Sequence, residues 1–115
     1  MRKLNRVRIL SESDKQLLRD LKEIILRYVP NATVILYGSA ARGEREPESD
    51  IDILVILDEP ISSQERDDMR SDIYYLQLDR DVVLSVMVYS KDEWYSPIHL
   101  VSPYHKNVEK DGVLL

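Results

Sequence analysis

The chain has 115 residues, 43% of them hydrophobic, and we expect one small domain with a single core over residues 1–115. Its 16 basic and 21 acidic residues give a net charge of −5, which argues against a long nucleic acid as partner. Cysteine is absent, which excludes thiolate metal sites, and no apolar run reaches the length of a membrane span. We therefore expect a cytoplasmic protein with no membrane partner.

The first expected element is an amphipathic helix. Ser13 and Gln16 form a possible capping box at its start, and Pro30 is expected to end it. Its apolar residues recur at helical spacing on one face, namely Leu17, Leu18, Leu21, Ile24, Ile25 and Tyr28. This stripe predicts a helix that packs on a sheet.

A strand over residues 33–37 then runs into Gly38 and Ser39. A glycine lets the backbone approach a phosphate closely, and a serine adds a hydroxyl donor. Residues 40–42 can form a short helical turn whose amino end favours an anion at the same point. Residues 38–42 are therefore predicted to contact a nucleoside triphosphate.

The chain reverses over residues 43–49 and enters a second strand over residues 50–57. Strand alternation puts Asp50 and Asp52 on one face, about 6.6 Å apart along the chain. At an effective dielectric near 20, two such charges repel by roughly 3 kcal/mol. A bound Mg²⁺ removes this repulsion, since Mg²⁺ is commonly held by one or two carboxylates together with substrate phosphates and water. The pair therefore predicts a metal site.

A second helix is expected to begin near Ser62, with Glu65 completing a capping box, and to end near Asp79. An alternating segment over residues 81–89 predicts a third strand, and Ser90 is expected to cap a following turn. The first two strands must be antiparallel for their motifs to meet. A crossover through the second helix makes the third strand parallel to the second.

Seven residues of this region resemble the signature of the DNA polymerase β nucleotidyltransferase superfamily, and the short chain resembles its minimal, MntA-like branch: Gly38, Ser39, Arg42, Gly43, Ser49, Asp50 and Asp52. The resemblance implies a small mixed β-sheet with helices packed on it, an α/β (α+β) fold. It also implies ATP or another nucleoside triphosphate as donor and two divalent metals, Mg²⁺ or Mn²⁺. Ser39, Arg42 and Ser49 would join Gly38 in binding the nucleotide. Arg42 could instead order the loop by pairing with a neighbouring glutamate.

The superfamily usually carries a third acidic residue on the next strand, and the looser match there puts Val83 at that position. Valine cannot bind a metal ion. Asp81 lies on the same alternation face one pleat earlier and could replace it as a catalytic and metal-binding residue. Asp79 could also do so, although it more naturally ends the second helix. A turn aspartate is an equally weighted interpretation of Asp81.

Two functions remain open from the sequence. In the first, the protein is an enzyme that transfers a nucleoside monophosphate to a hydroxyl. The MntA-like resemblance implies that the acceptor is a HEPN-domain toxin, modified with AMP at a tyrosine. In the second, favoured by Val83, the protein is a nucleotide-binding antitoxin or regulatory subunit with little transfer activity. A homo-oligomer is compatible with either function.

Overall fold

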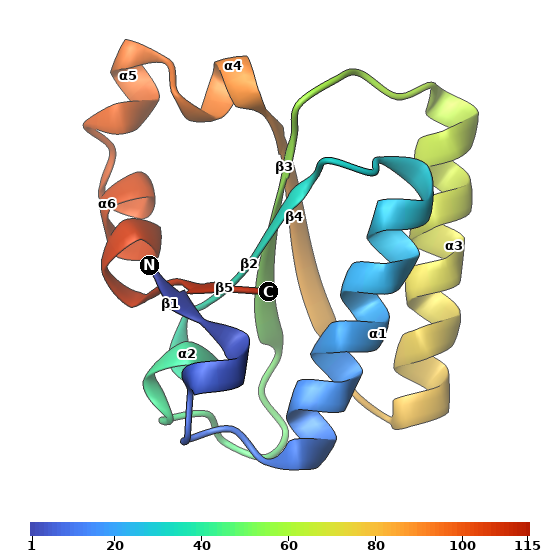
Figure 1. Cartoon of the computed structure of the whole chain (residues 1–115), viewed down its shortest axis with the longest axis vertical. Helices are drawn as coiled ribbons and strands as arrows, with labels where there is room; N and C mark the ends of the chain where they lie inside the picture. Colours follow the sequence, from blue (N-terminus) through green and yellow to red (C-terminus); the bar gives the residue numbers. More distant parts are fainter.

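The computed structural model describes the whole chain, residues 1–115. It forms a five-stranded sheet with the order β1-β5-β2-β3-β4 and with helices on both faces (Figure 1). The elements in chain order are β1 (Arg2–Lys3), η1 (Leu4–Arg6), α1 (Glu12–Tyr28), β2 (Thr33–Tyr37), α2 (Ser39–Arg42), β3 (Ile51–Leu57), α3 (Ser63–Arg80), β4 (Leu84–Ser90), α4 (Lys91–Trp94), α5 (Pro97–Leu100), α6 (Pro103–Asp111) and β5 (Val113–Leu114). The expected mixed sheet flanked by helices is confirmed.

The central strands have the directions that the sequence predicts. Strand β2 pairs antiparallel with β3, and β3 pairs parallel with β4 after the crossover through α3. The register places Tyr37, the last residue of β2, opposite Asp52 near the start of β3. The end of β2, helix α2 and the start of β3 therefore meet at one end of the sheet (Figure 1).

Helices α1 and α3 lie side by side on one face of the sheet (Figure 1). The apolar stripe of α1 is buried there, as the helical periodicity predicts. Alternate residues of β3 point into the same core, since Ile51, Ile53 and Val55 are all buried within it. This packing fixes the opposite orientation for the residues between them, which include Asp52.

The caps of the two long helices are partly as predicted. The capping box of Ser62 and Glu65 at the start of α3 is confirmed. The capping box expected for α1 is wrong, because the helix begins earlier and Ser11 is its cap. The Ser11 side chain accepts a hydrogen bond from the backbone N–H of Asp14. Ser11 and Ser13 both have the spacing of a helix cap, because each precedes a suitable polar residue by three positions. The helix begins at Glu12, so Ser13 is already inside it.

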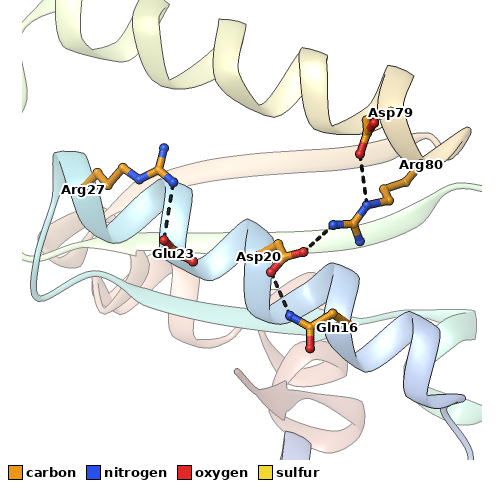
Figure 2. Close-up of polar contacts among 6 residues, drawn as sticks. All are labelled: Gln16, Asp20, Glu23, Arg27, Asp79 and Arg80. Atoms are coloured by element: carbon orange, nitrogen blue, oxygen red, sulfur yellow. Dashed lines mark hydrogen bonds and ion pairs between the residues drawn. The ribbon is translucent and has the colours of Figure 1, made fainter.

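A polar cluster links α1 to α3 on the solvent side (Figure 2). Arg80, the last residue of α3, donates to the carboxylate of Asp20 on α1, and also contacts Asp79 at 3.3 Å. Gln16 donates to the same Asp20 carboxylate at 2.9 Å. These donors, Arg80 first, lower the pKa of Asp20 below its ordinary value. The cluster therefore holds the two helices together while the Asp20 carboxylate is ionised.

The opposite face of the sheet is partly covered by α4 to α6 (Figure 1). Trp94 is fully buried against this face, and the ring of His105 stacks on it. The apolar residues of this second core are Ile35, Leu54, Ile56, Trp94 and Val108. Because Leu54 points to this side, Asp52 two residues earlier points there too.

The two ends of the chain lie together at one edge of the sheet. Strand β1 pairs parallel with β5, and β5 pairs antiparallel with β2. The Arg2 guanidinium donates to the carbonyls of Ala41 and Asp111, each at 2.8 Å. Arg2 therefore ties the amino end to α2 beside the predicted site. None of the helices has the length and apolar character that crossing a membrane requires.

Candidate functional site

The turn between β2 and α2 depends on Gly38. Its backbone has φ +76° and ψ −156°, a conformation that only glycine adopts readily. A Cβ atom at this position would lie 2.3 Å from Oδ2 of Asp52. The backbone of the turn therefore lies directly against the Asp52 carboxylate. The two halves of the sequence motif, 38–39 and 50–52, meet as predicted.

The carboxylates of Asp50 and Asp52 have no partner within the protein. Neither accepts a hydrogen bond from a side chain, and neither takes part in an ion pair. Asp52 is half-buried, and burial first and then the charge of Asp50 raise the pKa of Asp52, with Arg42 acting in the opposite direction. The pair thus holds two carboxylates without an ion-pair partner at the end of the sheet, and Arg42 offsets only part of the effect of burial and of Asp50 on Asp52.

A divalent cation fits this arrangement. Mg²⁺ uses one or two carboxylates and completes its octahedron with waters and phosphate oxygens. Asp50 and Asp52 supply two such carboxylates, and neither forms an ion pair with a protein cation. The structure holds no group of three acidic or histidine side chains placed to share one ion. The protein therefore offers two carboxylates to a cation, and the phosphate oxygens of a nucleoside triphosphate could complete the coordination sphere of that cation.

The structure does not bring Asp81 to this pair, which corrects the expectation that it supplies the third carboxylate. Asp81 caps the end of α3 with φ +51° and ψ +50°, and its backbone N–H donates to the carbonyl of Gln77. Strand β4 begins at Leu84, three residues after Asp81, so Asp81 belongs to the turn. Left-handed backbone is well tolerated by aspartate, which explains why the chain turns here.

Val83 lies where the missing carboxylate was expected. Its carbonyl accepts a hydrogen bond from the N–H of Ile51 at 2.9 Å, and its side chain is 54% exposed. The parallel register pairs Ile51 with Leu84, so Val83 lies beside Asp50. An apolar side chain therefore occupies the place next to Asp50.

Two other predicted residues are engaged within the protein. Arg42 donates to Glu44 and to Asp111, each at 3.1 Å, so it orders the loop by pairing with a neighbouring glutamate, one of the two roles considered for it. Ser49 donates its hydroxyl to the carbonyl of Glu46 at 2.8 Å. Ser39 is half-buried at the first position of α2. Donation by Ser49 to a nucleotide requires its hydroxyl to leave Glu46, whereas Arg42 keeps Nη2 free of protein partners.

Three hydroxyl groups near Asp52 have no signal in the sequence motif. Tyr37 and Ser85 are its partners in the register on β2 and β4. Tyr104 of α6 donates to the Tyr37 hydroxyl at 3.1 Å. Burial raises the pKa of Tyr37 and of Tyr104, and the charge of Asp52 adds to both shifts. Both Tyr37 and Ser85 are identified by the strand register, since alternation within one strand does not say which residues of the next strand share its face.

Comparisons with known proteins agree with this geometry. Residues 18–114 match the family described as the nucleotidyltransferase domain. MJ0141 of Methanocaldococcus jannaschii, assigned as a protein adenylyltransferase, is 31% identical over 85 residues, which are 74% of this chain and 80% of that protein. MJ1379 of the same organism, with the same assignment, is 47% identical over 45 residues, covering 39% of this chain and 45% of that protein.

Solved structures show the same fold. A crystal structure of a toxin–antitoxin with AMP-PNP has a TM-score of 0.56 and 16% identity, covering 84% of this chain and 69% of that chain. A crystal structure of a mutant of the toxin–antitoxin MntA-HpeT has a TM-score of 0.55 and 17% identity, and the match covers 85% of this chain and 70% of that chain. At these identities the similarity shows a shared fold, which is the fold that the MntA-like resemblance implies. The chain belongs to the nucleotidyltransferase domain family.

Proposed function

We propose that this protein transfers AMP from ATP to a hydroxyl group of a partner protein, a HEPN-domain toxin. The observation that carries the proposal is the close approach of the Gly38 turn to the carboxylate of Asp52, with the charge of Asp50 acting on that carboxylate and neither aspartate in an ion pair. Relatives assigned as protein adenylyltransferases support AMP transfer to a protein. Structural neighbours that are toxin–antitoxins support a toxin as the acceptor.

Each residue of the site has a defined task in this proposal. Asp50 and Asp52 hold one or two divalent ions, Mg²⁺ or Mn²⁺, which when bound neutralise the triphosphate and draw electron density from phosphorus. Gly38 lets the backbone of the turn approach the triphosphate, and Ser39 offers a hydroxyl to it. The hydroxyls of Tyr37, Tyr104 and Ser85 near Asp52 belong to the domain itself, and the proposal assigns the acceptor hydroxyl to the partner.

The reaction exchanges one phosphorus–oxygen bond for another. The acceptor oxygen forms a bond to the α-phosphorus of ATP, the bond from that phosphorus to the bridging oxygen breaks, and pyrophosphate leaves. The hydroxyl proton passes to water or to a carboxylate of the pair. Such a transfer depends on positioning and charge neutralisation more than on covalent chemistry by the protein. A rigid turn that fixes Asp52 serves this requirement.

A second function is favoured by one observation. Val83 lies beside Asp50, and no third carboxylate completes the set. A protein with this site could bind a metal-bound nucleotide as an antitoxin or regulatory subunit and transfer AMP poorly or not at all. Nucleotide binding is common to both functions, so only transfer separates them.

The test is an incubation of the protein with ATP, Mg²⁺ and the product of its neighbouring gene, followed by intact-mass measurement of both chains. Transfer adds one adenylyl group to the partner, the mass of AMP less one water, and Asp52→Asn should abolish the adduct. Asp81→Asn is the matched control, since it makes the same chemical change in the turn after α3 and should keep the adduct. Metal-dependent ATP binding without any adduct would support the regulatory function instead.

A further inference from the structure

Three polar residues, Tyr37, Asp52 and Ser85, lie in register across strands β2, β3 and β4. The register of the parallel pair β3 and β4 joins Asp52 to Ser85, and Ile51 to Leu84. Ile51 and Leu84 are both buried in the core under α1 and α3. Alternation therefore turns Asp52 and Ser85 together to the other face. Adjacent strands lie about 4.8 Å apart, so the two side chains are immediate neighbours.

Ser85 is unusual within its strand. The sequence of β4 is LSVMVYS, and Ser85 is the one hydroxyl residue in its first half. The side chain is half-buried, and its hydroxyl makes no hydrogen bond with any protein group. The neighbouring positions on this face of β4 are Val83 and Met87, neither of which carries oxygen. Tyr89 lies on the same face but pairs with Ile56, so Ser85 is the residue of β4 with a side-chain oxygen in register with Asp52.

The chemistry of a metal site gives this hydroxyl a use. Mg²⁺ keeps several waters when it is bound by one or two carboxylates, and those waters need acceptors and donors from the protein. A hydroxyl can hold such a water without adding a third negative charge to a pair that already repels. Asp81 cannot do this from its turn, and Val83 has no polar atom.

We propose that Ser85 is a positioning residue of this site, where its hydroxyl holds a water in the coordination sphere of the cation bound by Asp50 and Asp52. This inference rests on the proposed function, because it requires a cation at the carboxylate pair. It replaces the carboxylate expected on the third strand with a neutral group two residues after Val83, on the same face of the strand. The consequence is a metal site that depends on Ser85 but is weaker than one with three carboxylates.

The test measures Mn²⁺ binding rather than transfer. Free Mn²⁺ is followed by electron paramagnetic resonance while the protein is titrated in the presence of a non-hydrolysable ATP analogue. Ser85→Ala should weaken Mn²⁺ binding by about tenfold, the usual cost of losing a group behind the metal ligands. Ser85→Thr keeps the hydroxyl and should restore binding to within about threefold of the wild type. Ser85→Asp should tighten it, because its carboxylate can bind the ion directly.

The outcomes separate this inference from the proposed function. Unchanged Mn²⁺ affinity in Ser85→Ala, with the affinity lost in Asp52→Asn, overturns the role of Ser85 and leaves the carboxylate site standing. Unchanged affinity in Asp52→Asn removes the site itself. A Ser85→Thr variant as weak as Ser85→Ala also overturns the inference, since the hydroxyl is then not the active group. Thermal unfolding of each variant shows that the comparison is made between folded proteins.

Discussion

Gly38→Ala is expected to damage the site more than the fold. The backbone at Gly38 has φ +76° and ψ −156°, a region in which a residue other than glycine costs about 1–3 kcal/mol. The added Cβ would also lie 2.3 Å from Oδ2 of Asp52, a side-chain atom that can move. The carboxylate must shift by about 1 Å to reach an ordinary van der Waals distance. A displacement of that size at a reacting centre can cost about 100-fold in rate.

The matched control is Gly43→Ala at the other end of α2. Gly43 has φ +74° and ψ +21°, where alanine costs about 1–2 kcal/mol. Its added Cβ would lie 2.6 Å from Cγ2 of Ile9, away from the carboxylates. Both variants should therefore unfold at lower urea concentration than the wild type. Only Gly38→Ala should also lose Mn²⁺ affinity in the presence of a non-hydrolysable ATP analogue.

Two results would contradict the claim that Gly38→Ala lowers Mn²⁺ affinity by displacing the Asp52 carboxylate. Wild-type Mn²⁺ affinity in a folded Gly38→Ala protein would show that the close approach of the turn to Asp52 has no part in metal binding. An equal loss of affinity in Gly43→Ala would show that general destabilisation, and not the displacement of one carboxylate, causes the effect.

Three further predictions concern stability. Ser11→Ala should lower the free energy of unfolding by about 1 kcal/mol through loss of the α1 cap, whereas Ser13→Ala, inside the helix, should be nearly silent in the same urea titration. Asp20→Asn should destabilise the protein at neutral pH; because the pKa of Asp20 is lowered in the fold, the difference from wild type should shrink as pH falls below about 4. Asp52→Asn should leave the metal-free protein as stable as the wild type or more so, since burial and like charge disfavour the ionised carboxylate, and a large loss of stability would contradict this account.

Local patterns predict the elements near the site because the deciding contacts are local. The apolar run of β2 ends in Gly38, and the structure has this strand at residues 33–37 as expected. The capping pattern of Ser62 and Glu65 similarly places the start of α3. A cap and the first turn of a helix are fixed by residues three apart, which the sequence shows directly.

Features that depend on long-range contacts were not predictable in the same way. Strand β1 exists only because Arg2 and Lys3 pair with residues 113–114 at the far end of the chain. The start of β4 depends on Gln77, whose backbone carbonyl accepts from Asp81 and whose side chain accepts from the N–H of Leu84 at 2.8 Å. Alternation would equally allow the strand to begin at Asp81, which is why the third carboxylate was expected there.

A metal-bound nucleotide at Asp50 and Asp52 is tested most directly by calorimetric titration of the protein with a non-hydrolysable ATP analogue, once in Mg²⁺ and once in a chelator. We expect measurable binding of the analogue with Mg²⁺ and much weaker binding with the chelator, because the ion joins the triphosphate to the carboxylates of Asp50 and Asp52. In Asp52→Asn, Mg²⁺ should not change the affinity for the analogue. Equal affinity with and without metal, or an Asp52→Asn variant that responds to Mg²⁺ as the wild type does, would contradict the claim that these carboxylates hold a metal-bound nucleotide.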